Sequence, residues 1–297
     1  MVLRNITIED LETFEQIKNN KKSSFKNTLL SWLSDGMTKL EWCFLIEDNN
    51  NFLGRIIYGV FDNEANILDI NIQDFSDEIK DKLLLGSLKE MRLKGFTKVE
   101  CHLYSDKINY HQYVDILKKC QFQITQEKKS FVWDKGSINK LSKELIFKSL
   151  EFVGTEKYIA AIEKVTEGTL DRDDLNCIEE FGSSEAAGRY FNQLKDIDFN
   201  KSWWKLAYTN EEELIGLIIP QKFNDNVGAI NYIGVVPEKR GKGYVNELLR
   251  EGIIILSEDN IRKIIADIDI NNYPLEKALQ MEGFKLDCNM IALKINL

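Results

Sequence analysis

Histidine, proline and paired cysteines are all scarce in this sequence of 297 residues. Its two histidines, His102 and His111, are too few for a histidine-rich metal site, so we expect no bound metal. With only 3 prolines, a long disordered linker is not expected. The five cysteines are scattered and include no CxxC pair, which is typical of reduced thiols in a cytoplasmic protein rather than of a disulfide framework.

Long apolar runs are also missing. No stretch approaches the ~20 apolar residues that a membrane span needs. The N-terminal sequence MVLRNITIED turns polar within a few residues and has no apolar signal core. We therefore expect a cytoplasmic protein with no membrane partner.

Basic residues are outnumbered by acidic ones. Lys and Arg total 39, Asp and Glu total 48, and the formal net charge is −9. A protein that binds a nucleic acid duplex usually presents a basic face, so nucleic acid is not the expected partner. The acidic balance mildly favours cationic small molecules or basic peptide ends as ligands, because such a surface attracts them electrostatically.

The length fits two domains of ordinary size. The segment 134–142 contains Gly136 and Ser137, and no periodic apolar pattern crosses it. We therefore predict one domain over residues 1–137 and a second over residues 143–297.

The two halves share one order of expected elements. In the first half we expect strand 3–6, helix 8–18, strands 42–46 and 53–60, helix 80–94, strand 99–103, helix 110–120 and a strand from Phe122. In the second half we expect strand 145–147, helix 155–167, strands 204–208 and 214–219, helix 244–256, strand 263–268, helix 275–282 and a strand from Phe284. This order indicates an α/β fold with a mixed sheet, repeated by internal duplication or by chance similarity.

The most informative segment is a strand followed by a glycine-rich turn. The apolar run 229–236 ends at Pro237, which cannot continue a central strand. The sequence Arg240-Gly241-Lys242-Gly243 follows, and a helix begins after it. Backbone N–H groups and the helix dipole make such a turn an anion site, with Arg240 and Lys242 adding charge at its rim. Taken alone, the segment is more typical of a basic, flexible turn than of a phosphate site.

A second motif lies about thirty residues further on, where Asn272 ends a strand and Gly283-Phe284 enters the last one. Together with Val235-x-Pro237 and Arg240-x-x-Gly243, this arrangement resembles the GNAT superfamily of acyltransferases. The resemblance implies two tandem GNAT-like domains, each a mixed, mostly antiparallel sheet flanked by helices. Residues 143–297 would form the acetyl-CoA-binding domain.

The resemblance also implies a binding mode. Two neighbouring strands would splay apart, the arm of acetyl-CoA would fill the gap, and the pyrophosphate would rest on the backbone of residues 240–245. The N–H of Val235 would polarise the thioester carbonyl, and Asn272 would hydrogen-bond the arm. The residues expected to bind the cofactor are Val235, Val236, Arg240, Gly241, Lys242, Gly243, Tyr244, Val245 and Asn272.

Three positions depart from the family pattern. Val245 replaces a small residue and would narrow the approach to the phosphate. Leu279 stands where relatives often have a general-acid tyrosine. The strand before Pro237 has no carboxylate for a general base and offers only Asn231 and Tyr232 as weak catalytic candidates. Tyr232 is more typical of a buried strand aromatic than of a catalytic residue.

Two further segments bear on the site. Residues 168–174 are expected to form a solvated loop near the acceptor entrance, where Asp171 and Asp173 are an alternative site for a cationic amine. In the first half, residues 74–80 take the place of the glycine-rich turn; they are acidic and lack glycine. We therefore predict a degenerate N-terminal domain that has lost cofactor binding.

The resemblance implies an acetyl-CoA-dependent N-acetyltransferase in which a small-molecule or peptide amine attacks the thioester directly. Two alternatives stay open: transfer of a larger acyl or aminoacyl group, and a non-catalytic regulator that binds acyl-CoA. A homodimer is compatible with each of these functions. The sequence does not identify the acceptor.

Overall fold

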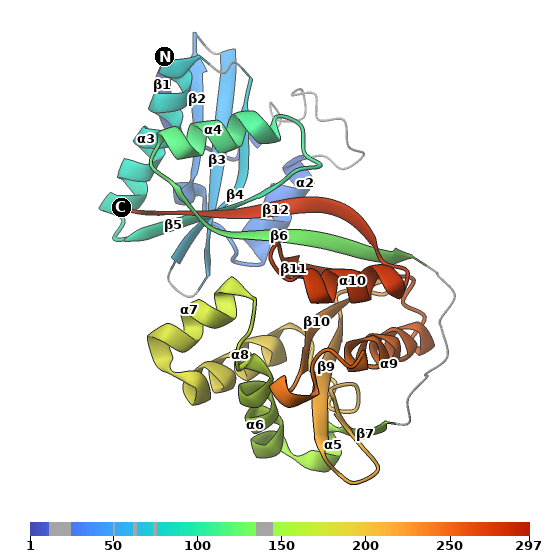
Figure 1. Cartoon of the computed structure of the whole chain (residues 1–297). Coiled ribbons are helices and arrows are strands. Elements are labelled where there is room, and N and C mark those ends of the chain that lie inside the picture. The colour runs from blue at the N-terminus through green and yellow to red at the C-terminus, as the bar shows by residue number, and fades with distance from the viewer. Residues whose placement is uncertain (12–24, 50, 62–63, 74–75, 135–144) are drawn as a thin grey trace. The chain divides into compact units, whose positions relative to one another are not determined.

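The computed structural model describes residues 1–11, 25–49, 51–61, 64–73, 76–134 and 145–297. The chain divides into two compact units (Figure 1): unit 1 contains residues 1–125 and 291–297, and unit 2 contains residues 126–290. Most of the predicted break at 134–142, and most of the helix expected over 8–18, lie outside the described residues.

Unit 1 is built on the sheet order β1-β2-β3-β4-β5, with β12 beside β5. Its helices and strands, in chain order, are β1 (Val2–Asn5), α2 (Phe25–Ser34), the 3-10 helix η1 (Leu40–Trp42), β2 (Cys43–Asp48), β3 (Asn51–Phe61), β4 (Glu64–Ile72), α3 (Asp77–Leu93), β5 (Lys98–Tyr104) and α4 (Tyr110–Lys119). Two long strands follow elsewhere in the chain, β6 (Gln123–Asp134) and β12 (Lys285–Asn296).

Unit 2 has the sheet order β6-β11-β10-β9-β8-β7. Its remaining elements are β7 (Ile146–Ser149), α5 (Leu150–Val153), α6 (Thr155–Thr166), α7 (Arg172–Phe181), α8 (Ser183–Ile197), β8 (Lys205–Tyr208), β9 (Leu214–Lys222), β10 (Val227–Val235), η2 (Pro237–Lys239), α9 (Tyr244–Glu258), β11 (Lys263–Asp269) and α10 (Tyr273–Met281). Nearly every element expected from the sequence is present, whereas β4, the helices α2, α5, α7 and α8, and the two 3-10 helices were not anticipated.

Both units contain the same pairing pattern. In each, two antiparallel strands pair with a register shift, between Ile57 and Tyr58 in unit 1 and between Ile230 and Tyr232 in unit 2. In each, the next strand pairs in parallel over three residues, β4 with β5 and β10 with β11. The predicted mixed, mostly antiparallel sheet flanked by helices is confirmed, and the repeated order of elements extends to the details of strand pairing.

The compact units do not follow the predicted boundaries at 137 and 143. Residues 126–134 of β6 belong to unit 2, where they pair with β11 from Lys128↔Asp269 to Asp134↔Lys263. Residues 291–297 belong to unit 1, where Ile291 and Leu293 enter the apolar core. The reason is that each unit completes its sheet with a strand that the sequence order assigns to the other half.

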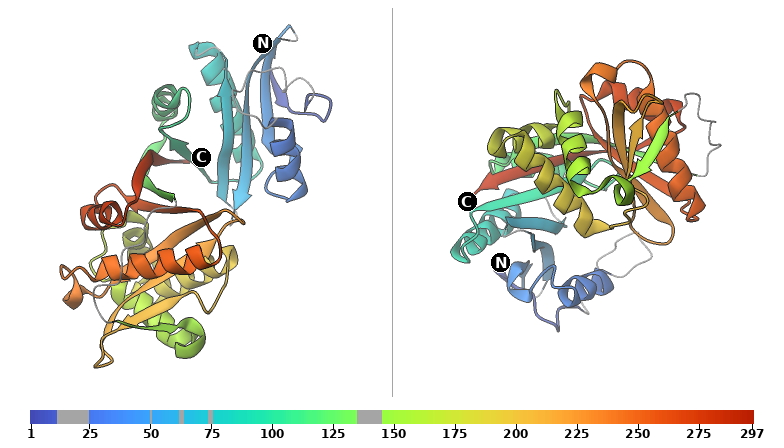
Figure 2. Two further views of the ribbon diagram at one scale, coloured as in Figure 1. Left: turned by 90° about the vertical axis from the view of Figure 1, so that its right-hand side faces the viewer. Right: turned by 90° about the horizontal axis from the view of Figure 1, so that it is seen from below.

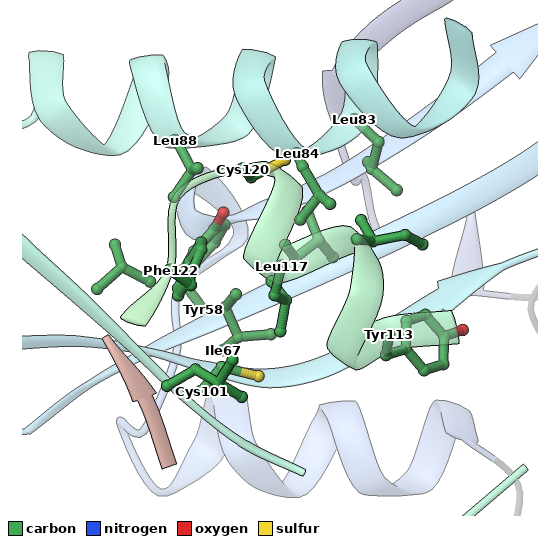
Figure 3. Close-up of a cluster of buried hydrophobic side chains, with 14 of the residues drawn as sticks. Tyr58, Ile67, Leu83, Leu84, Leu88, Cys101, Tyr113, Leu117, Cys120 and Phe122 are labelled. Atoms are coloured by element: carbon green, nitrogen blue, oxygen red, sulfur yellow. The ribbon is translucent and has the colours of Figure 1, made fainter. Parts of the chain in front are cut away.

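The core of unit 1 fills the space beside its parallel strand pair. Figure 3 shows Leu117 of α4 close to Ile67 of β4 and Cys101 of β5, whereas Tyr113 lies apart from them. The Tyr113 hydroxyl accepts a hydrogen bond from the backbone N–H of Ile72 at 3.1 Å. The protein's own side chain therefore meets the end of β4. The predicted loss of cofactor binding in this half stays a prediction.

The sheet of unit 2 has apolar clusters on both faces. Ile218 of β9 packs with Leu249 and Ile253 of α9, whereas Leu217 packs with Phe191 of α8 in a second cluster. Figure 2 shows α9 and the α6–α8 helices on opposite sides of these strands. Because both faces are covered, β9 is buried along most of its length, and its sequence has no polar side chain from Leu214 to Pro220.

Candidate functional site

A cavity of about 260 Å³ lies in unit 2 where β10 and β11 separate. The two strands pair only from Val227↔Lys263 to Ala229↔Ile265, while β10 continues beside β9 as far as Val235. Beyond Ala229 the facing edges of β10 and β11 border the cavity. Its walls include Ala229, Ile230, Asn231, Tyr232, Ile233, Ile265, Ala266, Asp267 and Ile268 from these strands, and Leu249, Asn272, Leu275 and Leu279 from helices.

The other end of the cavity is polar and acidic. It is formed by Lys128, Thr169, Asp171, Asp173, Asp174, Tyr190 and Tyr232. One end of the cavity is thus a slot between two strands, and the other presents carboxylates and phenols.

Helix α7 brings the carboxylates to this end. Asp171 caps the helix, because its side chain accepts hydrogen bonds from the N–H groups of Asp173 at 2.9 Å and Asp174 at 3.4 Å. This cap turns Asp174 inward, where only 8% of its surface is exposed. The segment predicted to be a solvated loop is therefore in part a capped helix with a buried carboxylate, and that prediction is wrong for Asp174.

Two hydroxyl groups donate hydrogen bonds to the same carboxylate oxygen of Asp174. Thr169 Oγ1 donates to Asp174 Oδ2 at 2.9 Å, and the Tyr232 hydroxyl donates to the same oxygen at 3.3 Å. Burial, together with the neighbouring Asp171 carboxylate, raises the pKa of Asp174 to about 6. The group therefore changes its protonation state close to neutral pH.

Tyr232 stacks with Tyr190, their ring centroids lying 4.6 Å apart. Burial raises the pKa of both phenols well above the usual range, and the charge of Asp174 adds to the effect. Both hydroxyls thus stay protonated near neutral pH, and Tyr232 acts as a hydrogen-bond donor. The structure places this predicted candidate in the cavity wall.

Asn231, the other catalytic candidate, lies at the register shift of β10 and also borders the cavity. Its Nδ2 donates to the Gln221 Oε1, and Gln221 Nε2 in turn donates to the carbonyls of Leu194 and Asp198. This chain of bonds ties the strand to the end of α8. The side-chain amide of Asn231 therefore stabilises the bulge.

The glycine-rich turn lies between η2 and α9. Gly241 and Gly243 have φ angles of +73° and +77°, in the left-handed region that favours glycine. Helix α9 begins at Tyr244 directly after them. The N–H groups of a first helical turn have no partner within the helix and lie at the positive end of its dipole. The turn therefore has the properties of an anion site.

The guanidinium of Arg240 is hydrogen-bonded to four backbone carbonyls. It donates to the carbonyl oxygens of Val235 at 3.0 Å, Gly168 at 3.0 Å, Val165 at 2.9 Å and Glu167 at 2.7 Å. These bonds fasten the end of α6 and the start of the α6–α7 connection to the end of β10. The Arg240 side chain therefore donates to backbone carbonyls, and the expectation that its charge contributes at the rim of the turn stays a prediction.

Three valines predicted to bind the cofactor contact the protein interior. Val235 and Val236 are buried in the clusters on the two faces of the sheet, and neither is among the cavity walls. Val245 is half-buried and packs against the cluster beneath α9. If Val235 and Val236 contact a ligand, they do so through backbone atoms and not through their side chains.

Asn272 and Leu279 both border the cavity from α10. Asn272 caps this helix, its side-chain oxygen accepting a hydrogen bond from the N–H of Leu275 at 3.3 Å. Leu279 is fully buried, and the nearby Tyr273 is 64% exposed. Tyr273 therefore does not replace the tyrosine that relatives often have at position 279.

The functional residue that sequence reasoning missed is Asp174. Asp171 followed by Leu175, Ile178 and Phe181 at three-residue spacing is a capped amphipathic pattern, and it would have predicted α7. Nothing in that pattern indicates that Asp174 is buried, since its burial comes from β10 and α8 packing against the helix.

Within the described parts of the chain, no group of three or more His, Cys, Asp or Glu residues is arranged to hold a metal ion. The helices described there are all too short or too polar to cross a membrane.

Residues 172–284 match the model of the acetyltransferase (GNAT) family. A solved GCN5-related N-acetyltransferase from Sphaerobacter thermophilus is similar, with a TM-score of 0.67 and 11% identity over 99% of this chain and 95% of that one. A tandem GNAT protein from the clavulanic acid biosynthesis pathway has a TM-score of 0.54 and 10% identity over 86% and 82% of the two chains. A GCN5-related N-acetyltransferase from Kribbella flavida has a TM-score of 0.56 and 9% identity over 90% and 94%. At these identities the likeness concerns the fold, and no curated protein matches the sequence.

Proposed function

We propose that this protein is an acetyl-CoA-dependent N-acetyltransferase, because residues 172–284 match the model of the acetyltransferase (GNAT) family. Its acceptor in this proposal is a small-molecule or peptide amine that attacks the thioester directly. The observation that carries the proposal is the separation of β10 and β11 after three paired residues, next to the glycine-rich turn at the start of α9.

The described residues fit this co-substrate. The slot between the strands exposes backbone on both sides, so an extended pantetheine arm can hydrogen-bond as an added strand does. A Cβ atom built at Gly241 would have no protein atom within 4 Å, so the space around this part of the turn is open. The pyrophosphate is proposed to rest there on the N–H groups of residues 240–245, with Lys242 exposed nearby.

Acetyl-CoA would supply an acetyl group already activated as a thioester. The protein's part is to align the acceptor amine with that group and to exclude bulk water. The backbone N–H of Val235 is the proposed donor to the thioester carbonyl, where negative charge develops during attack. Leu279 and Leu249 form an apolar wall of the cavity, which limits the access of water.

No general acid beside the sulfur is needed in this scheme. A thiol has a pKa of about 8.5, so coenzyme A leaves as a thiolate without prior protonation. The apolar Leu279 is therefore compatible with catalysis.

The decisive experiment is calorimetric titration of the full chain with acetyl-CoA and, separately, with coenzyme A. We expect saturable binding of both at one site per chain. If neither acetyl-CoA nor coenzyme A binds, the proposed cofactor site is rejected. Binding without thiol release from acetyl-CoA in the presence of any amine would favour the non-catalytic acyl-CoA regulator.

A further inference from the structure

Asp174 has one carboxylate oxygen that the fold does not use. Both hydroxyl donors, Thr169 and Tyr232, bond to Oδ2. Among the described residues no group donates to Oδ1, although the side chain is more than nine-tenths buried. Oδ1 is not among the fully enclosed side-chain atoms that lack a partner, so it is open to the cavity that Asp174 lines, where a ligand can reach it.

The setting of Asp174 is strongly charged. Among the described residues, the titratable groups around it include Asp171, Asp173 and Cys177 near or on its own helix, Lys128 on β6, Tyr190 on α8, Tyr232 on β10 and Asp267 on β11. Lys128 lies 3.2 Å from Asp173 and is thereby paired. The remaining carboxylates give this end of the cavity a negative charge that favours a cation.

We propose that Asp174 is the general base of the transfer, and that its Oδ1 accepts the proton of an acceptor that enters as a cationic primary ammonium ion. This inference rests on the proposed acetyltransferase function. It assigns the base to helix α7, whereas the strand β10 offered only Asn231 and Tyr232.

The proposed step balances as follows. An ammonium proton first passes to Asp174 Oδ1, and the neutral amine nitrogen then forms a bond to the thioester carbonyl carbon. The carbon–sulfur bond breaks, and its electron pair leaves with the sulfur of coenzyme A. The nitrogen loses its second proton, through water, to the thiolate, and Asp174 returns its own proton to water.

Tyr232 is a positioning residue in this scheme. Its hydroxyl and that of Thr169 fix Oδ2, which directs the other oxygen toward the cavity. The hydrogen bond from Tyr232 also favours the ionised carboxylate, since it lowers the pKa of Asp174 against the upward effect of burial.

The test compares Asp174→Asn with the unmodified protein on ethylamine and its mono-, di- and trifluorinated derivatives. These probes keep nearly one size while their basicity falls, so the last is largely unprotonated at neutral pH. Coenzyme A release is measured at saturating acetyl-CoA. Loss of a general base typically lowers the rate ~10²–10⁴-fold, and we expect a loss of that size for ethylamine that shrinks steadily to less than about tenfold for trifluoroethylamine.

The matched control is Glu179→Gln, which removes one carboxylate from the exposed face of the same helix. We expect its rates to equal those of the unmodified protein. An equal loss with all four amines would overturn the inference, because a purely structural role does not depend on acceptor basicity. Absence of turnover with every amine, alongside saturable acetyl-CoA binding, would also overturn it and leave the cofactor site standing. Absence of acetyl-CoA binding would instead reject the proposed function itself.

A second variant tests the inference while it keeps the Asp174 carboxylate. Tyr232→Phe retains the ring that stacks on Tyr190 and removes the hydrogen bond to Oδ2. Because that bond lowers the pKa of Asp174, the acid limb of the rate–pH profile should move to higher pH. An acid limb that stays in place would contradict the assignment.

Discussion

Replacing Asp174 by asparagine should make the protein more stable at neutral pH. In the folded protein its carboxyl has a pKa of about 6, against 3.8 for an unperturbed aspartate. Since each pKa unit corresponds to about 1.4 kcal/mol, ionising the buried group costs about 3 kcal/mol of folding free energy. An amide of the same shape does not ionise and escapes this cost.

The sign of the effect follows from the raised pKa. Between about pH 4 and about pH 6 the folded state holds the proton more tightly than the unfolded chain, so stability contributed by this group falls as pH rises. Above pH 6 the full cost is present. The stability difference between Asp174→Asn and the unmodified protein should therefore grow from near zero at about pH 4 to about 3 kcal/mol at about pH 7.

The assay is urea unfolding at several pH values, monitored by tryptophan fluorescence. The dependence of the unfolding free energy on urea concentration, m, is checked to be the same for both proteins. Groups common to both proteins cancel in the difference, and Glu179→Gln serves as the control with no pH-dependent difference. A difference that does not change between about pH 4 and about pH 7 would refute the raised pKa and the reasoning built on it.

Three further predictions concern the turn and the strands that frame the cavity. Arg240→Lys keeps the positive charge but loses the guanidinium group with its several N–H donors. Since two of the four Arg240 hydrogen bonds are partly buried, we expect ~2 kcal/mol less stability in urea unfolding. Loss of acetyl-CoA affinity at unchanged stability would instead indicate that the guanidinium contacts the ligand. Gly243→Asp should abolish acetyl-CoA binding in calorimetry, because it adds a negative charge to the turn. Gly243→Asn tolerates the positive φ angle equally well and should bind acetyl-CoA more tightly than the aspartate variant. Equal affinity of the two variants would contradict the assignment of an anion site to this turn. Gly234→Ala would bring a Cβ atom within 2.7 Å of Val165, so we expect ~1–3 kcal/mol of destabilisation, whereas Gly188→Ala in α8, with nothing within 4 Å, should be neutral or slightly stabilising in the same measurement.

Strand and helix order could be predicted because apolar periodicity and turn residues act locally. The run from Ala229 to Pro237 and the turn at Gly241 and Gly243 lie in the structure where the sequence places them. The cofactor-binding roles given to residues 235–245 stay predictions, since no measurement tests them.

Side-chain roles in the site were harder to predict because they depend on distant partners. The sequence gives no sign that Arg240 reaches carbonyls around residue 167, or that Asn231 bonds to Gln221. Asp174 reads as one more polar residue of an acidic stretch. Only the packing of α8 and β10 against α7 buries it and raises its pKa.

The assignment of residues 291–297 to unit 1 has a consequence for how the protein is made. Residues 126–290 are synthesised between the two segments that compose this unit. Until they have emerged, β5 lacks the strand β12 that lies beside it, and Ile291 and Leu293 are missing from the core. A nascent chain thus carries an open, apolar sheet edge through the synthesis of the whole second unit, and such edges pair readily with other chains. The segment most exposed to aggregation during synthesis is therefore the half of the protein to which no chemistry is assigned.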